Sequence, residues 1–300
     1  MQKRKGFTII EVSLVLGISA LAVAAFMATI GGRISAQRYN DATRGYVDFL
    51  QKIYSDVINV QNSRSGEIGD EAKYCTVSNQ YNISHDAFAN GDYDNEYPGR
   101  SACSIYGKLV TFGEKDEDKL YIYDVIGKAL DLNETLGGSA GNVAAELADV
   151  YADVLALKRN SGGTCKLAPA GNSYSYTPEW GTRIETTDRN LLKGSLLIVR
   201  SPKSGAVRSL FMPRVLEIQK AISDNSNVNC DNTSVDSSTR LEPLLRNGDF
   251  KQENVDFCVS TNGLFVSQRS DVRLNSDGHN ATAVELVEKD LKPEDGGNKC

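Results

Sequence analysis

The sequence contains few of the residues and motifs on which most catalytic sites depend. Histidine occurs only twice, as His85 and His279, and both lie in polar stretches with no nucleophile motif nearby. The chain also lacks the glycine-rich patterns of nucleotide sites, the HExxH pair of zinc proteases and the GxSxG turn of hydrolases. We therefore expect a protein that is not an enzyme.

Positive charge is also in short supply. Lysine and arginine number 33 against 39 aspartates and glutamates, so the net charge is -6 at pH 7. A nucleic-acid surface needs clustered lysine and arginine, and we therefore expect no nucleic-acid partner. The exception is a basic cluster at the N-terminus, formed by Lys3, Arg4 and Lys5. Its isolation in an acidic chain indicates a targeting role.

The cysteines do not follow a metal-binding pattern, because none forms a CxxC pair. The six cysteines are Cys75, Cys103, Cys165, Cys230, Cys258 and Cys300. Their even number predicts disulfides formed in an oxidising compartment, with reduced, buried thiols as the alternative. Six cysteines allow about 15 connectivities, and the sequence does not choose among them. Cys300 is the last residue, so a disulfide to Cys230 or Cys258 would tie down the tail.

Charge is absent from the stretch between Val12 and Ile30. As an α-helix this stretch would be roughly 29 Å long, close to the thickness of a bilayer core. The basic cluster precedes it, whereas Arg33 is the first charge after it. Because the more positive flank stays in the cytoplasm, the rest of the chain is expected to cross the membrane.

Two ordinary explanations of this stretch leave Glu11 unexplained. One is a cleaved signal peptide, which usually has a shorter apolar region followed by small residues, and 22–28 does contain small residues. The other is a plain single-span anchor. A carboxylate beside an apolar run opposes insertion by up to about 3 kcal/mol at the bilayer centre and less near an end. Such a residue usually has a partner, and neither explanation provides one.

The residues around Glu11 form a specific pattern. Gly6-Phe7-Thr8-Ile9-Ile10-Glu11-Val12, followed by an apolar run, resembles the prepilin signal of type IV pilins and type II secretion pseudopilins. The resemblance implies that a prepilin peptidase cuts between Gly6 and Phe7. It also implies that Phe7 becomes an N-methylated N-terminal residue and that the apolar segment is retained.

The same resemblance implies a role for Glu11 in assembly. Its carboxylate would pair with the liberated Phe7 amine of a neighbouring subunit, which offsets two costly charges and fixes the axial register. The alternative is a glutamate that only complements the dipole at the start of a helix. The implied partners are copies of this chain or other pilins in a helical filament, the prepilin peptidase, the pilus assembly platform and, before assembly, the membrane. The implied location is the inner or cytoplasmic membrane, followed by an extracellular pilus or the cell surface.

The expected fold is α+β and pilin-like, with one long N-terminal helix packed on an antiparallel β-sheet head. From Tyr46 to Ile58, apolar residues recur at three- and four-residue spacing, which predicts an amphipathic helix half. The expected division is a cleaved leader at 1–6, a transmembrane and filament-core helix at 7–31 and an amphipathic half at 32–62. The extracellular head at 63–300 would have a loop-rich, disulfide-stapled C-terminal region.

The apolar helix departs from the family in one respect. Many type IV pilins have a proline there, where the helix can unwind during assembly, and this chain has none. Gly17 or Gly31-Gly32 are the candidates for that flexibility, since glycine weakens helices.

The head is expected to contain short strands and two helices. Strands are predicted at 104–112, 119–126, 196–200, 206–212, 255–260 and 264–270, and helices at 143–158 and 215–222. The segments 67–102, 164–190 and 223–240 are expected to be loops. Trp180 is the only tryptophan, and we expect it to be a packing residue.

An acidic cluster lies in the first of these loops, formed by Asp92, Asp94 and Glu96. Carboxylates at this spacing are a weak candidate for calcium, but the glycine and distal glutamate of an EF-hand are missing. A solvated acidic loop is the preferred interpretation, and no cofactor is expected.

The expected function is that of a structural subunit of a type IV pilus or a related filament. The first alternative is a type II secretion or competence pseudopilin. The second is a single-span membrane-anchored adhesin without a role in a filament. Cleavage of the leader separates this last alternative from the other two.

Overall fold

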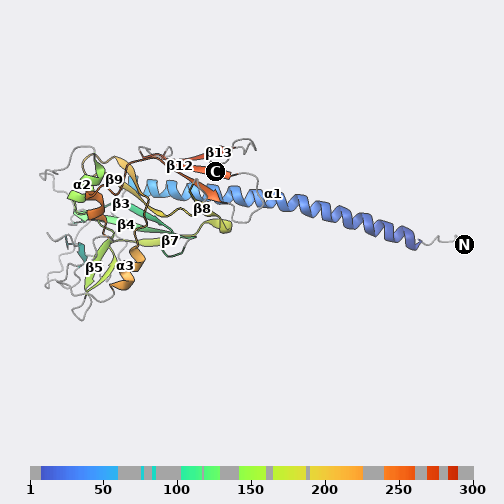
Figure 1. The fold of residues 1–300 in the computed structure, drawn as a ribbon, viewed down its shortest axis with the longest axis horizontal. Coiled ribbons are helices and arrows are strands. Elements are labelled where there is room, and N and C mark those ends of the chain that lie inside the picture. Colours follow the sequence, from blue (N-terminus) through green and yellow to red (C-terminus); the bar gives the residue numbers. More distant parts are fainter. Residues whose placement is uncertain are drawn as a thin grey trace.

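The computed structural model describes residues 8–59, 76–77, 83–85, 103–116, 118–128, 142–159, 165–186, 190–225, 240–260, 269–276 and 283–289. Figure 1 shows a head of sheets and short helices, from which one long helix projects toward the N-terminus. The fold is α+β, as expected, and its strand pairs are antiparallel except for β2 with β5.

The described strands form three sheets. The central sheet has the order β10-β9-β3-β4-β7 and contains β3 (Cys103–Phe112), β4 (Leu120–Lys128), β7 (Ser173–Tyr176), β9 (Gly194–Arg200) and β10 (Val207–Met212). The C-terminal sheet has the order β13-β12-β11-β8 and contains β8 (Arg183–Glu185), β11 (Val255–Ser260), β12 (Arg269–Leu274) and β13 (Val284–Lys289). The small sheet has the order β1-β2-β5-β6 and contains β1 (Thr76–Val77), β2 (Ile83–His85), β5 (Leu155–Arg159) and β6 (Cys165–Pro169). The helices are α1 (Ile9–Ile58), α2 (Val143–Asp149), the 3₁₀ turn η1 (Glu179–Gly181), α3 (Ile218–Asp224) and α4 (Leu241–Arg246).

The long helix α1 is continuous over 50 residues, which corresponds to roughly 75 Å. It passes through Gly31-Gly32 without a break. It begins after Thr8 and ends at Ile58, and the backbone N–H of the following residue, Asn59, donates to the carbonyl oxygen of Ser55. Compared with the predicted helix at 7–62, the observed one ends earlier, and the remaining residues 60–62 lie outside the described part of the chain.

The C-terminal part of α1 packs between the central sheet and the C-terminal sheet (Figure 1). The predicted apolar stripe faces this core, and the burial of each such side chain contributes about 1.5–3 kcal/mol to stability. Tyr39 is also fully buried and extends the stripe toward the N-terminus, which the spacing from Tyr46 onward did not indicate. The stripe consists of Tyr46, Leu50, Ile53, Tyr54 and Val57, which are buried, and Phe49 and Ile58, which are partly buried.

The central sheet is buried on both faces. In β9, Leu196 and Ile198 belong to the core that contains α1, whereas Leu197 and Val199 belong to a second core. This second core is completed by side chains of α2, α3 and α4. Two buried faces explain why β9 reads as a continuous apolar run and not as an alternating pattern.

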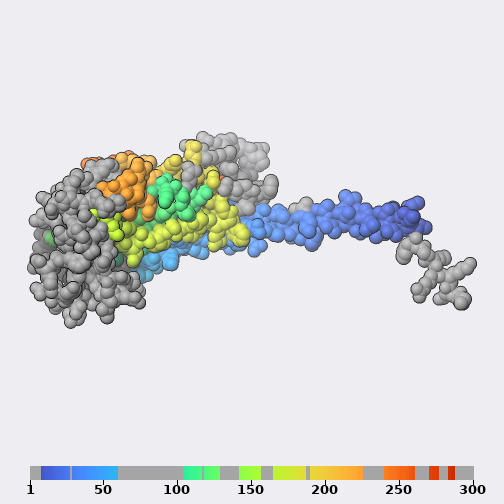
Figure 2. Space-filling model, turned by 90° about the horizontal axis from the view of Figure 1, so that it is seen from below, coloured from blue at the N-terminus to red at the C-terminus, as the bar shows by residue number. Residues whose placement is uncertain are grey.

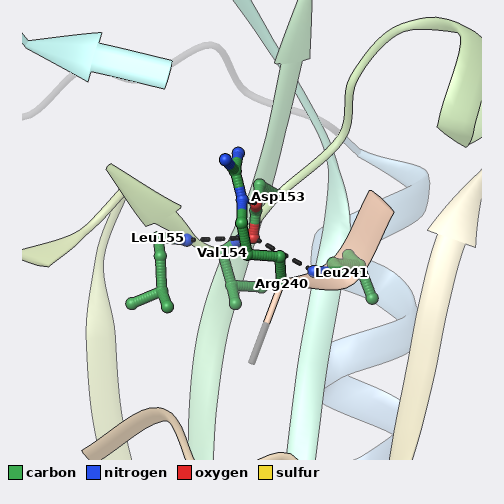
Figure 3. A network of polar contacts seen from close by, with 5 residues as sticks. All are labelled: Asp153, Val154, Leu155, Arg240 and Leu241. Carbon is green, nitrogen blue, oxygen red and sulfur yellow. Dashed lines mark hydrogen bonds and ion pairs between the residues drawn. The ribbon is translucent and has the colours of Figure 1, made fainter. Parts of the chain in front are cut away.

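A buried ion pair between Asp153 and Arg240 stabilises the second core (Figure 3). The carboxylate of Asp153 is completely buried and accepts a hydrogen bond from Arg240 Nε at 2.9 Å. It also accepts hydrogen bonds from the backbone N–H groups of Val154 at 2.8 Å and Leu241 at 3.4 Å. The contact joins the start of α4 to the segment between α2 and β5. A buried carboxylate is tolerated here because it is both paired and hydrogen-bonded.

A second carboxylate, Glu114, connects α3 to the end of the β3–β4 pair. Thr111 Oγ1 and Tyr123 Oη donate to its Oε2 at 2.7 Å and 2.9 Å, and the backbone N–H of Gln219 donates to Oε1. Burial raises the pKa of Glu114 above its ordinary value, although these hydrogen bonds oppose the shift. Protonated Glu114 therefore stabilises the folded state. This contribution is fully present below the ordinary pKa and is lost as the pH rises through the raised folded-state pKa.

Replacing Glu114 with glutamine is expected to remove this pH dependence. The free energy of unfolding of the wild-type protein, relative to E114Q, should fall as the pH rises above 4.5, the ordinary pKa of the group. Urea unfolding of both proteins in detergent, with the disulfides intact, measures this difference across a pH series. The exposed Glu253 provides the control substitution E253Q. A difference between wild type and E114Q that stays constant with pH would contradict the assignment.

Two predicted segments are wrong. The helix expected at 143–158 ends at Asp149. Tyr151 has a left-handed φ of 53°, and β5 pairs with β6 from Leu155 onward. The carboxylate of Asp153 accepts the N–H groups of Val154 and Leu155, which stops a helix from continuing. The loop expected at 164–190 contains the short strands β6, β7 and β8, which are added to three different sheets, and the 3₁₀ turn η1.

The other predicted elements agree more closely with the structure. Strands β3, β4, β9, β10 and β11 and helix α3 lie within a few residues of the predicted ranges. In the last hairpin the described part of the second strand, β12, is Arg269–Leu274, and the predicted start at 264 falls in 261–268, which lies outside the described residues. Helix α4 and strand β13 were not predicted, and His85 belongs to the short strand β2 and not to a loop.

Candidate functional site

The part of α1 from Ile9 to Arg38, here called the arm, projects from the head and is exposed along most of its length, with Ser35 and Ala36 partly buried at its base (Figures 1 and 2). A helix that is apolar around its whole circumference normally lies in a membrane or in a protein core. Among the described residues, α1 is the helix that is long and apolar enough to cross a membrane. The exposed large hydrophobic residues of the arm are Ile9, Ile10, Val12, Leu14, Val15, Leu16, Ile18, Leu21, Val23, Phe26, Met27 and Ile34.

The arm begins with a reciprocal cap formed by Thr8 and Glu11. The backbone N–H of Thr8 donates to Glu11 Oε2 at 2.9 Å, and the Thr8 hydroxyl donates to the same oxygen at 3.0 Å. The backbone N–H of Glu11 lies 3.3 Å from the Thr8 hydroxyl oxygen. This Thr-x-x-Glu capping box satisfies backbone donors that a helix start leaves unpaired. The pattern is visible in the sequence, but the sequence prediction assigned no role to Thr8.

The cap bears on both interpretations of Glu11. The local interpretation, in which the carboxylate complements the start of the helix, describes its contacts in the isolated chain. Only Oε2 takes part in them, and within the described residues Oε1 makes no hydrogen bond. The cap therefore holds the carboxylate in place and leaves one oxygen for a second partner. Gly6 and Phe7, the predicted processing residues, lie outside the described part of the chain.

The arm is joined rigidly to the head at Tyr39. The Tyr39 hydroxyl donates to the carbonyl oxygen of Val259 at 2.9 Å and accepts from the backbone N–H of Ser270 at 2.7 Å. Val259 and Ser270 are opposite residues of β11 and β12. The hydroxyl thus bridges two strands of the C-terminal sheet at the level where the arm leaves the head, so the sheet fixes the direction of the arm.

The predicted cysteine and calcium sites are only partly described. Cys165 in β6 and Cys258 in β11 are disulfide-bonded and buried. Cys103 begins β3, and its side chain lies outside the described residues, as do Cys75, Cys230 and Cys300. The acidic cluster of Asp92, Asp94 and Glu96 lies outside them as well. The described residues contain no group of histidine, cysteine, aspartate or glutamate suited to a metal ion.

A small hollow lies in the head between the turn after β3 and the segment around η1. Its volume is about 10 Å³, which is room for one water molecule at most. Its lining includes the ion pair between Arg183 and Asp118, at 2.6 Å. A hollow of this size does not hold an organic substrate.

Comparison with protein-family models, with curated proteins and with solved structures found no match to this chain. The arm, its capped start and its rigid junction with the head are therefore the features from which a function can be argued.

Proposed function

We propose that the protein is a structural subunit of a type IV pilus or a related filament. The observation that carries the proposal is the exposed apolar arm, in which Glu11 is the one charged residue before Arg33. A folded head with an uncovered apolar helix is not stable as a free monomer in water, because such a surface associates. The arm lies in the membrane until it is transferred into a bundle of arms.

Assembly of the arms gives Glu11 a second partner. Cleavage after Gly6 frees the amine of Phe7, which is a positive charge at the start of the arm. In a bundle of arms, this amine pairs with the Glu11 carboxylate of a neighbouring subunit. Both charges would otherwise remain uncompensated in an apolar environment, so the pairing selects one axial offset between subunits.

The head then occupies the outside of the filament. Tyr39 connects the arm to the C-terminal sheet through two hydrogen bonds, so the packing of the arms sets the orientation of each head. A pseudopilin of a secretion or competence system would use the same arm, and filament imaging distinguishes it from a pilus subunit.

Processing of the leader provides the direct test. In cells that contain a prepilin peptidase, the mature protein is expected to begin at Phe7, as measured by intact mass and N-terminal sequencing. A G6L variant should keep its leader and remain in the membrane, because a bulky side chain hinders access of the peptidase to the peptide bond. The substitution Q2L changes the leader away from the cut and serves as the control.

The other outcomes are distinct. A mature protein that begins beyond Ile30 would identify a cleaved signal peptide and would overturn the proposal. A mature protein that begins at Met1 in the presence of an active peptidase would overturn the proposal and support the alternative of a single-span anchored protein. Imaging of sheared surface filaments with an antibody against the head checks the second half of the proposal, because a filament subunit must be present along or at the end of such filaments.

A further inference from the structure

An exposed tryptophan lies beside the arm at the point where it leaves the head. Trp180 is the only tryptophan of the chain, and 51% of its surface is exposed. It belongs to η1, which packs against α1, and the Arg38 guanidinium lies 4.6 Å from the centre of its ring. Figure 2 shows the yellow-green segment that includes η1 against the blue helix near the base of the arm. Trp180 thus packs against the base of the arm on one side and is exposed on the other.

The backbone of this turn is unusual for a bulky residue. Trp180 has a left-handed φ of 56°, and the next residue, Gly181, has a φ of 68°. Left-handed backbone is disfavoured for large side chains. Burial does not compensate for it here, because half of the ring remains outside. The turn holds a large aromatic ring on the surface at a defined place.

That place is level with the end of the apolar arm. Arg38 lies about 12 Å along the helix beyond Ile30, and the exposed Ile34 lies between them. A hydrocarbon core of about 30 Å corresponds to about 20 helical residues. If the core extends to Ile34, the ring of Trp180 lies at the level of the lipid headgroups. Arg33 would then extend its guanidinium outward to the same level.

We infer that the Trp180 turn rests in the headgroup layer of the membrane and holds the head in a fixed orientation before assembly. Tryptophan is enriched at this level because its ring is apolar and its N–H is polar. Arg33 and Arg38 provide positive charge for lipid phosphates at the same height. The inference rests on the proposed membrane-inserted state of the arm and adds a second contact between protein and lipid.

The fixed orientation has a consequence for assembly. A helix that crosses a bilayer alone is free to rotate about its own axis. A head-side contact at Trp180, together with the rigid junction at Tyr39, would restrict this rotation and the tilt of the arm. Each subunit would then hold its head at the same tilt and height above the bilayer.

The single tryptophan makes the inference directly testable by fluorescence. The full chain is reconstituted in vesicles of phosphatidylcholine and phosphatidylglycerol, with or without lipids brominated near the headgroup end of their acyl chains. Bromine quenches only tryptophan that lies close to it. Trp180 fluorescence is expected to shift to shorter wavelength in vesicles, to lose intensity with brominated lipid and to be protected from iodide in the water.

A matched control places the tryptophan higher on the head. Tyr174 in β7 is 40% exposed, and Tyr176 of the same strand stacks on Phe49 of α1 with ring centres 4.0 Å apart. Phe49 lies roughly 16 Å farther along α1 than Arg38, so β7 is well away from the base of the arm. In the double variant W180F/Y174W, the tryptophan should be quenched by iodide and not by brominated lipid.

The outcomes separate this inference from the proposed function. Flotation of the protein with vesicles reports insertion of the arm. A protein that does not float contradicts the membrane state that both proposals need. A protein that floats while Trp180 behaves like the Tyr174 control overturns the headgroup contact alone. Protection of Trp180 in assembled filaments but not in vesicles would also overturn it and would assign the ring to contact with a second copy.

Discussion

The E11Q variant is expected to reach the membrane normally and to be almost absent from surface filaments. Glutamine keeps an oxygen that can accept the Thr8 hydrogen bonds, so the start of α1 remains capped. It lacks the negative charge that the proposed pairing with a neighbouring Phe7 amine requires. Removing one partner of a buried ion pair costs about 3–5 kcal/mol, which corresponds to a decrease of more than 100-fold in incorporation. Immunoblots of sheared filaments, compared with membrane fractions, measure this ratio.

The T8V variant is the matched control for the cap. Valine has nearly the shape of threonine but cannot form the hydroxyl hydrogen bonds to Glu11. Loss of an N-cap costs about 0.5–2 kcal/mol, so T8V should assemble far better than E11Q. If E11Q entered filaments as well as the wild type, the carboxylate would have only its local capping role. If T8V failed as severely as E11Q, the cap and not the charge would limit assembly.

The R240M variant is expected to be strongly destabilised. It leaves the Asp153 carboxylate completely buried with backbone N–H donors but without its cation. An uncompensated buried charge of this kind costs about 3–5 kcal/mol. For a domain of this size such a loss corresponds to a fall in Tm of roughly 6–20 °C. Thermal unfolding in detergent, with the disulfides intact, measures it.

Two further variants test whether the charge itself is responsible. Arg214 forms an exposed ion pair with Asp249 at 3.9 Å, and 55% of its side chain is exposed. R214M should therefore change stability by less than about 1 kcal/mol. The double variant D153N/R240M removes both charges and should recover part of the stability lost by R240M. If R240M and R214M had equal effects, the buried pair would not fasten the second core.

The elements that could be predicted from the sequence are those whose conformation depends on residues close to one another in the chain. The absence of charge from Val12 to Ile30 and the spacing of apolar residues from Tyr46 to Ile58 predicted a long helix with two different halves. Both are local patterns that depend only on helix geometry. The β9–β10 hairpin was predicted for the same reason, because its strands are adjacent and its turn is short.

Local sequence patterns gave wrong predictions where contacts with residues distant in the sequence determine the backbone conformation. The apolar spacing at 143–158 fits a helix, but the chain leaves α2 at Asp149 and turns into β5. Asp153 is held there by Arg240, which lies 87 positions away. Strands β6, β7 and β8 form within 165–185 because each pairs with the edge strand of a different sheet. Periodicity within a segment contains no information about such distant partners.

The sequence by itself determined that this chain has an apolar arm, an acidic residue at its start and a head of short strands, because length, charge and periodicity are local properties. Only the tertiary structure decided that the central sheet is covered on both faces, that Tyr39 fixes the arm to the head and that Trp180 is exposed at its base. Each of these features depends on residues brought together from distant positions, as with Tyr39 and Ser270, which are 231 positions apart. Burial and hydrogen bonding across such separations are settled by the packing of the whole chain.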